Sequence, residues 1–548
     1  MVSASSGTPV VSCTRYLFGR GPAKFARPTR NACNHFKVQI YRLQVARWRN
    51  FNFRRNRRLT HCYVINLQVA ADLCRPADRR MGCGRSTGSS DTFHRCQGGE
   101  MAMLPRIRVK GATIVSMDPT LGIIDPGDLL IDNGKIVAVG RNVGSWAVME
   151  IDGRGMIAMP GFINGHIHLW QTALRGVAAD WTLDHYFDVL IGKVVRLYTA
   201  QDAYIGNLVG ALDQINSGVT TLFDWCHIVN TPDHADAAVD ALQETGIRAV
   251  FAYGTPMTLF GTKEPHPADA RRMRKERLSS SDALVTMALA IRGTDFAPGT
   301  AETDIKYARD LGLLASFHVA CAKHGPRPQS MQNLAEQHLL GPDINLVHAN
   351  FLTADEFRVI ANNGASVSIT PEVEMQMGLG LPPTGAVLAA RVNFNIGTDV
   401  VTGVSTDMFT QMRFLIQMQR ALTNDTFHKQ ETMPDKLVMT ARQALELATI
   451  KSAQCLGLDG RIGSLTPGKE ADIVLLRKSD INMRAAADPI SAIVLHAGVA
   501  NVDTVIVGGQ IVKQNGKLTY RELPRRLSDL ERSSERLYAG FLAHESAA

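Results

Sequence analysis

The sequence has little of what marks a secreted or membrane-embedded protein. No apolar run among its 548 residues approaches the roughly 18 residues that cross a bilayer. No apolar core of about 7–15 residues, which a secretory signal requires, lies near the start. Beyond residue 100 there are only three scattered cysteines, which exclude a disulfide framework: Cys226, Cys321 and Cys455. We therefore expect a cytoplasmic protein that does not enter a membrane.

Acidic residues are scarce in the first hundred positions, which hold 18 Lys and Arg but 4 Asp and Glu. The remainder holds 41 basic and 47 acidic residues, so a mildly acidic body carries a basic extension. The interleaved cations and aromatics of 47–58 suit nucleic-acid phosphates and bases. We favour another interpretation, in which 1–102 is disordered or is read-through ahead of a start at Met101 or Met103, because ordered patterns begin only after it. Nucleic-acid binding is thus the less favoured alternative.

Strand patterns occur near both ends of the body. Short alternating or apolar runs, one of them a hairpin around Asn133-Gly134, lie at 107–115, 128–140, 471–476 and 502–512. Strands from both ends of a chain can join in one unit and leave the middle as an insert. We therefore predict a small β-sandwich domain made of 103–158 and 459–520, followed by a helical tail at 521–548.

The middle of the chain, 159–458, alternates helical patterns with short apolar runs. After the strand that carries His166, buried parallel strands are expected at 220–224, 248–253, 314–318, 344–348, 365–369 and 392–399. Such alternation over about 300 residues predicts a closed (β/α)₈ barrel, whose active site lies at the C-terminal ends of its strands. The predicted fold class is α/β, a TIM-like barrel with a small β-sandwich formed by the flanks.

Polar side chains stand where these strands end. His166 and His168 are one residue apart on a strand, so both side chains point to the same face. The later strands end in Asp224, His318, His348 and Asp399. Three imidazoles and a carboxylate suit a borderline-soft divalent ion, Zn²⁺ in preference to Fe²⁺. We assign one such ion to four ligands: His166, His168, His318 and Asp399.

The same residues provide the chemistry of a hydrolase. A bound Zn²⁺ lowers the pKa of water from 15.7 to about 7. Asp399 can take the proton of that water, and His348 can stabilise the oxygen that becomes negative. Two alternatives stay open: Asp399 as a helix N-cap and His348 as a hydrogen-bonded core residue.

The segment 160–168, PGFINGHIH, followed by LRG at 174–176, resembles the metal-dependent amidohydrolase superfamily. It is most similar to the branch of triazine hydrolases and cytosine, guanine and adenosine-type deaminases. The resemblance covers roughly 107–515 and includes 346–350, 397–399, 448–450 and 463–475. It implies a barrel with an attached β-sandwich, one metal on the four assigned ligands, and His348 as an unligated catalytic group. Binuclear members carry a lysine after the fourth strand, which we take to be 248–254; none stands there, so we expect one metal.

Two positions depart from the family's pattern. Deaminases of this branch carry a proton-shuttling Glu three residues after the fifth-strand His, whereas Cys321 stands three residues after His318. The seventh-strand segment, usually Pro-x-Ser-Asn, reads PEVE at 371–374. Glu374, or with less support Glu372, is therefore a candidate for the displaced catalytic acid. The alternative is that both are solvated loop carboxylates.

We predict a hydrolase of carbon–nitrogen bonds other than peptide bonds, which deaminates an N-heterocycle through metal-activated hydroxide. The alternative is hydrolysis of an amide, urea, substituted amine or halide on a ring, for which Asp399 alone can supply the leaving-group proton. We expect a small N-heterocyclic or amide substrate and a homo-oligomer, a dimer or larger. Residues that can cover an aromatic ring, or serve as ordinary core or dimer contacts, are Trp170, Gln171, Trp181, Tyr186 and Phe187.

Overall fold

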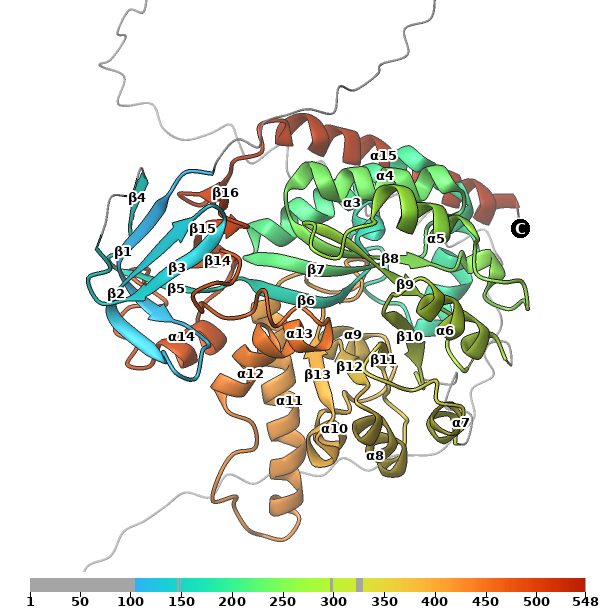
Figure 1. Cartoon of the computed structure of the whole chain (residues 1–548). Coiled ribbons are helices and arrows are strands. Elements are labelled where there is room, and N and C mark those ends of the chain that lie inside the picture. Colours follow the sequence, from blue (N-terminus) through green and yellow to red (C-terminus); the bar gives the residue numbers. More distant parts are fainter. Residues whose placement is uncertain (1–103, 145–146, 148, 296–298, 322–328, 548) are drawn as a thin grey trace, which may run out of the picture. The chain divides into compact units, whose positions relative to one another are not determined.

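The computed structural model describes residues 104–144, 147, 149–295, 299–321 and 329–547 (Figure 1). The basic extension lies outside the described residues, and the nucleic-acid alternative that rests on it stays a prediction. None of the helices in the described ranges is both long and apolar enough to span a membrane.

Eight parallel strands form the central barrel and pair in chain order. They are β6 (Phe162–Ile167), β7 (Val219–Cys226), β8 (Arg248–Gly254), β9 (Val285–Ala290), β10 (Ala315–Val319), β11 (Ile344–His348), β12 (Ser366–Ile369) and β13 (Asn393–Ile396). The barrel closes where Ile167, at the end of β6, bridges to Asp399, just past β13. This architecture confirms the predicted (β/α)₈ barrel.

One barrel strand, β9, was absent from our sequence prediction. Its sequence, VTMALA, is rich in alanine, which is depleted in strands, and it lacks a run of β-branched residues. The segment at 248–254 is therefore the third strand and not the fourth, as we had taken it to be. The true fourth strand, β9, carries no lysine either, and Arg292 follows it.

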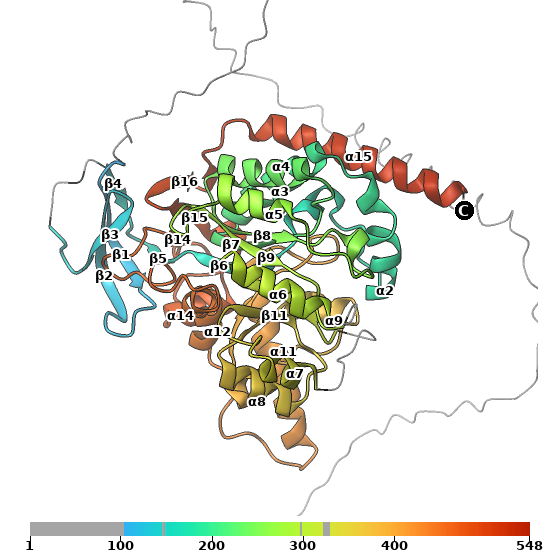
Figure 2. The same ribbon diagram turned by 45° about the vertical axis from the view of Figure 1, so that its right-hand side comes forward.

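Helices connect the strands and cover the outside of the barrel (Figures 1 and 2). The longer ones are α3 (Ala200–Asn216), α4 (Pro232–Thr245), α6 (Thr300–Asp310), α8 (Ala354–Asn363), α11 (Met408–His428) and α15 (Leu523–Ala547). The shorter ones are α2 (Leu183–Tyr186), α5 (Asp269–Arg272), α7 (Ser330–Glu336), α9 (Pro371–Gln376), α10 (Thr384–Ala390), α12 (Ala441–Leu447), α13 (Ile450–Cys455) and α14 (Pro489–Leu495). Short 3₁₀- or π-helical segments lie at η1 (Leu169–Leu174), η2 (Phe187–Ile191), η3 (Val194–Leu197), η4 (Met257–Leu259), η5 (Met273–Arg277) and η6 (Val499–Asn501).

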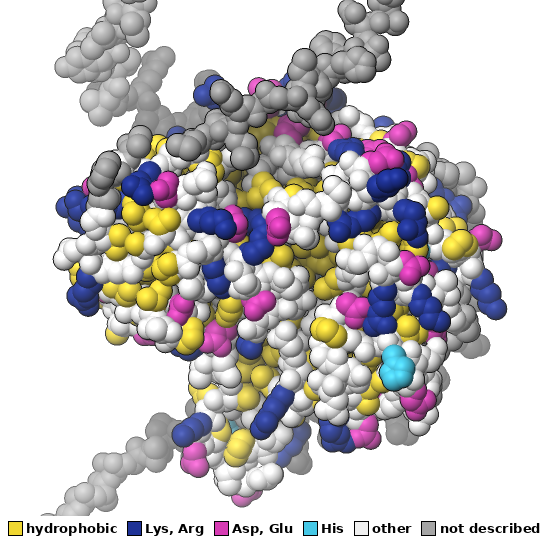
Figure 3. All heavy atoms as spheres, viewed as in Figure 1, with side chains coloured by type: hydrophobic (Ala, Val, Ile, Leu, Met, Phe, Trp, Pro, Cys, Tyr) yellow, Lys and Arg dark blue, Asp and Glu magenta, His cyan; other side chains and the backbone are white. Residues whose placement is uncertain are grey.

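The ends of these helices follow from local sequence signals. At α8, the Thr353 hydroxyl accepts the Glu356 N–H and the Glu356 carboxylate accepts the Thr353 N–H, which is a capping box. The same helix ends at Gly364, whose φ of 77° suits a residue without Cβ. Surface charges on the outer helices are paired: Arg277 contacts Asp236 (2.8 Å) and Asp240 (2.5 Å) of α4. On the face in Figure 3, basic and acidic side chains are accordingly interspersed.

The two flanks of the barrel build a second sheet of nine strands. These are β1 (Ile107–Val115), β2 (Ile123–Asp132), β3 (Lys135–Gly140), β4 (Met149–Asp152), β5 (Met156–Pro160), β14 (Ile473–Arg477), β15 (Val502–Val507), β16 (Gln510–Gln514) and β17 (Lys517–Leu518). The two halves meet where β5 pairs antiparallel with β14. The flanks therefore form one additional sheet, as expected, while the exact domain boundaries stay a prediction.

A buried ion pair joins the base of the barrel to this second sheet. Arg248, the first residue of β8, donates to both carboxylate oxygens of Asp472 over 2.8 and 3.1 Å. Both residues are about 4% exposed. Removing one partner of such a pair leaves the other charge buried and unpaired, which lowers the free energy of unfolding by about 3–5 kcal/mol.

We therefore expect Arg248→Ala to lower the free energy of unfolding by about 3–5 kcal/mol. The measurement is denaturant unfolding of wild type and variant. The double variant Arg248→Met/Asp472→Leu, which removes both charges, should recover most of the loss. A double variant no more stable than Arg248→Ala would contradict this account.

Candidate active site at the carboxyl ends of the barrel strands

The four predicted metal ligands come together at one end of the barrel. His166 lies in β6, His168 just after it, His318 in β10, and Asp399 after β13. One ligand atom from each residue lies within 4.8 Å of all the others. The Nε2 atoms of His166 and His168 are 3.3 and 3.2 Å from Asp399 Oδ1.

The donor set suits a divalent cation. Both ring nitrogens of His166 are buried without a hydrogen-bond partner among the described residues, as expected for a group whose partner is an ion. His168 Nδ1 contacts the Trp225 carbonyl oxygen at 2.6 Å, which leaves its Nε2 directed to the cluster. The residues present therefore fit a metal bound by imidazole nitrogens and one carboxylate.

Protonation states at the cluster also suit metal binding. Burial lowers the pKa of His166 to about 4, against the opposing effect of Asp399. Burial, with the neighbouring imidazoles of His166 and His348, lowers the pKa of His318 well below its usual value. Although burial opposes it, the close contacts with the imidazoles of His166 and His168 hold the pKa of Asp399 well below its ordinary range. Neutral imidazoles and a charged carboxylate are the forms that bind metal.

The backbone at the site is strained. Ala320, His348 and Asp399 have φ of 55°, 70° and 60°, in the left-handed region that few non-glycine residues adopt. All three stand at or just past the ends of barrel strands, and such strain is characteristic of functional sites. Gly397 serves a related purpose, because a Cβ there would lie 2.5 Å from the His166 carbonyl oxygen. Only glycine lets β13 approach β6 so closely.

His348 and Glu374 form a buried pair beside the cluster. His348 Nδ1 lies 3.2 Å from Glu374 Oε1, and its Nε2 lies 3.7 Å from Asp399 Oδ2. Glu374 Oε1 also accepts the Thr370 N–H at 2.9 Å. Burial lowers the pKa of His348, but the hydrogen bond with Glu374 and the charge of Asp399 outweigh it and raise that pKa.

Both carboxylates of the PEVE segment lie in α9 and only Glu372 is partly exposed, so the alternative that both are solvated loop groups is wrong. Glu374 is fully buried and stands behind His348, outside the described lining of the cavity. Glu372 accepts hydrogen bonds from Ser405 Oγ (2.6 Å) and Gln411 Nε2 (2.9 Å), neither of which belongs to the metal-ligand cluster.

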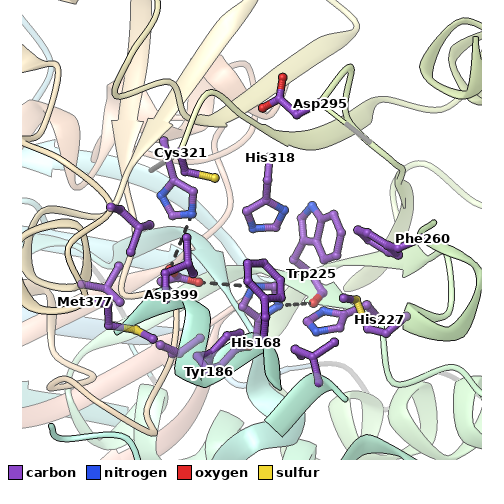
Figure 4. Close-up of a pocket in the computed structure, with 18 residues that line it drawn as sticks. His168, Tyr186, Trp225, His227, Phe260, Asp295, His318, Cys321, Met377 and Asp399 are labelled. Carbon is purple, nitrogen blue, oxygen red and sulfur yellow. Dashed lines mark hydrogen bonds and ion pairs between the residues drawn. The ribbon is translucent and has the colours of Figure 1, made fainter. Parts of the chain in front are cut away.

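Three of the four ligands, His168, His318 and Asp399, line a cavity of about 700 Å³, a volume that includes space open to solvent (Figure 4). Its aromatic lining consists of Tyr186, Phe187, Trp225 and Phe260. Tyr186 and Phe187 thus lie where a ring could be covered. Trp170 and Gln171 are buried and lie outside the described lining, and Trp181 stacks on His185. Cys321 also faces the cavity, and burial raises the pKa of its thiol to about 12, so it stays protonated.

Several residues that line the cavity were absent from our sequence prediction, Asp295 among them, and one expected strand-end residue lies outside the described lining. Trp225 and His227 line the cavity. Asp224, which directly precedes Trp225 in β7, points away from the cavity and accepts the Leu169 N–H. Because side chains alternate along a strand, this arrangement could have been predicted if it had been known which face of β7 points into the barrel. Burial raises the pKa of Asp224 to about 7.

The buried Asp224 makes stability depend on pH. In the folded chain its carboxyl keeps a proton up to about pH 7, whereas an unfolded Asp loses it near 3.9. Asp224 therefore contributes up to about 4 kcal/mol to the free energy of unfolding. This contribution is fully present below about pH 4 and is lost as the pH rises to about 7. We expect Asp224→Asn, which cannot ionise, to raise Tm relative to wild type more at pH 8 than at pH 5. A difference independent of pH would contradict this.

Comparison with known proteins places this geometry in a family. Residues 157–512 match the model of the amidohydrolase family. A 5'-deoxyadenosine deaminase of Methanobrevibacter smithii is 30% identical over 437 residues, which cover 75% of this chain and 95% of that protein. A 5-methylthioadenosine/S-adenosylhomocysteine deaminase of Desulforudis audaxviator is 28% identical over 451 residues, 79% of this chain and 99% of that protein.

The chain belongs to the amidohydrolase family. It is a hydrolase acting on carbon–nitrogen bonds other than peptide bonds, which confirms the class predicted from the sequence.

Solved structures agree on the amidohydrolase fold. An adenosine deaminase from Xanthomonas campestris with bound zinc superposes with a TM-score of 0.68 at 22% identity, over 79% of this chain and 98% of that one. A single-residue mutant of an atrazine chlorohydrolase from Arthrobacter aurescens TC1, in complex with zinc and atraton, has the same TM-score and identity, over 78% of this chain and all of that one.

Proposed function

We propose that this amidohydrolase is a zinc-dependent deaminase, which replaces an exocyclic amino group of an N-heterocycle with oxygen and releases ammonia. The observation that carries the proposal is the convergence of His166, His168, His318 and Asp399 within 4.8 Å beside an aromatic-lined cavity. The relatives' names, which specify deaminases of adenosine derivatives, support an aminated purine as the first substrate class to test.

The metal site supports zinc in preference to iron. Three imidazoles and a carboxylate are a common zinc donor set, and Zn²⁺ supplies the Lewis acidity that brings the pKa of water to about 7. Because each of the four residues provides one ligand atom to a single cluster, one ion per chain is proposed.

Asp399 is positioned to receive the proton of the attacking water. Its pKa is held well below the usual range, and its Oδ1 and Oδ2 face different partners, the imidazoles of the cluster and His348. A carboxylate within reach of the water removes its proton as the bond to carbon forms. The same carboxyl can then deliver a proton to the leaving nitrogen.

His348 is positioned to stabilise the reacting heterocycle. Glu374 holds the Nδ1 side of the ring, so Nε2 is presented to Asp399 and the cavity. A fixed donor aimed at developing negative charge lowers the barrier without reorganisation during the reaction. We propose Glu374 as the residue that positions His348.

One observation favours a second candidate activity. Cys321 stands where deaminases of this branch carry a proton-shuttling Glu, and a thiol whose pKa burial raises to about 12 does not shuttle protons at neutral pH. Hydrolysis of an amide, urea, substituted amine or halide on a ring needs one shuttle only, and Asp399 can provide it.

The test is ammonia release by the full chain, loaded with zinc, from aminated purines, pyrimidines and triazines. We expect ammonia from at least one purine, loss of that release on chelation, and its return with added zinc. Release of an amine, carboxylate or halide from substituted rings, with no ammonia from the zinc-loaded protein, would replace deamination by the second activity. The predicted homo-oligomer can be tested on the same preparation by light scattering.

A further inference from the structure

A chain of three buried polar side chains ends at the cavity. Thr402 Oγ1 donates to Gln171 Oε1 over 3.2 Å, and Gln171 Nε2 donates to the Tyr186 hydroxyl over 2.6 Å. Gln171 and Thr402 are wholly buried, and Tyr186 is 6% exposed. Gln171 lies in η1, just past β6, and Thr402 follows β13, so the chain connects the two sides of the barrel closure.

This arrangement fixes the direction of the Tyr186 hydrogen. The Gln171 amide turns its oxygen to the Thr402 hydroxyl and its nitrogen to Tyr186, so that its N–H fills one acceptor site of the Tyr186 hydroxyl. The single hydrogen of the phenol is therefore directed elsewhere, and no acceptor for it occurs among the described residues. Burial raises the pKa of Tyr186, so the hydroxyl stays neutral and retains that hydrogen.

Tyr186 is also the only described residue lining the cavity that carries a hydroxyl. Figure 4 shows it on the opposite side of the labelled cluster from Cys321. A thiol is a weak hydrogen-bond donor, so Cys321 is a poor partner for a ring nitrogen. The flat aromatic walls provided by Phe187, Trp225 and Phe260 favour a planar ring, whose nitrogen lone pairs point outward in the ring plane.

We propose that Tyr186 is a substrate-binding residue whose hydroxyl donates a hydrogen bond to a ring nitrogen of the bound N-heterocycle. This inference rests on the proposed function and specifies its substrate class: planar rings that present an unprotonated nitrogen to Tyr186. Gln171 and Thr402 are the positioning residues. No proton is transferred in this contact, which contributes through binding alone.

The test compares the Kd of adenine with those of 1-, 3- and 7-deazaadenine, each lacking one ring nitrogen, on the full zinc-loaded chain. In the wild type, one deaza analogue should bind about tenfold more weakly than adenine, because the phenol then has no acceptor. In Tyr186→Phe, adenine and that analogue should bind equally. Gln171→Leu should reduce the discrimination without abolishing it.

Tyr198→Phe is the matched control. Tyr198 is also buried, but its hydroxyl donates to the Trp170 carbonyl over 3.2 Å and it is outside the described cavity lining. This variant should keep the wild-type preference for adenine. Discrimination that survives in Tyr186→Phe, or a wild type that binds no adenine or binds all four compounds equally, would overturn the inference. A ring-nitrogen preference that depends on Tyr186, without ammonia release from any compound, would instead overturn the proposed function and leave this inference intact.

Discussion

Replacing Asp399 with asparagine is expected to lower kcat for ammonia release by about 10³-fold. The carboxamide has nearly the same shape and can still ligate through its oxygen, but it cannot take a proton at neutral pH. Positioned proton transfer contributes about 10²–10⁴-fold to enzymatic rates. Asp399 is buried, charged and in contact with His166, His168 and His348, so few other groups could substitute for it.

The measurement is steady-state ammonia release with the best substrate, together with zinc content by atomic emission. Zinc content separates the loss of a base from the loss of the metal. Asp224→Asn is the matched control, since Asp224 is an equally buried strand-end carboxyl that points away from the cavity. It should keep kcat within about twofold of wild type. A zinc-replete Asp399→Asn protein with kcat within tenfold of wild type would remove Asp399 from proton transfer.

The second large loss of activity is expected on substitution of Glu374. This residue contacts His348 and none of the four ligands, and it is not among the described residues that line the cavity. We expect Glu374→Gln to lower kcat about 10- to 100-fold and to change KM by less than about threefold, the loss typical of outer residues that orient a reacting group. Glutamine can keep the bond from the Thr370 N–H, but it lacks the charge that holds His348 Nδ1. A loss confined to kcat indicates a group acting in the transition state.

Glu372→Gln provides the control for this variant because both residues lie on α9. Glu372 bonds to Ser405 and Gln411 instead of His348. We expect its kcat to stay within about twofold of wild type, with unchanged zinc content. Equal losses in the two variants would point to a disturbed α9 and not to positioning of His348.

A site residue can be predicted from the sequence when the fold alone determines which way its side chain points. Strand ends in a parallel barrel converge, so the grouping of His318 with the distant Asp399 could be predicted from spacing and order alone. The inward face of β7 could not, because all eight of its residues are buried and no polar alternation marks a side. That is why Asp224 was expected among the functional strand ends, while Trp225 and His227 were overlooked.

Glu374 shows a different limit. Its presence in place of the usual residues was visible, but whether it faced the metal or His348 depends on the rotation of α9. That rotation is set by packing of Pro371 and Val373, both buried, and by the bond from Thr370 to Glu374. Packing between distant segments of this kind leaves no short-range signal in the sequence.

The pairing of β5 with β14 has a consequence for synthesis on the ribosome. Some 310 residues separate Pro160 from its partner Ile473, and at about 5–20 residues per second the ribosome needs roughly 15 to 60 seconds to make them. During this interval β5 presents an unpaired edge with apolar Ile157, Ala158 and Met159, a template for pairing with another nascent chain. The nascent barrel, the cell's chaperones or both must protect that edge until β14 emerges, so a message truncated before residue 473 should yield aggregates instead of a free barrel.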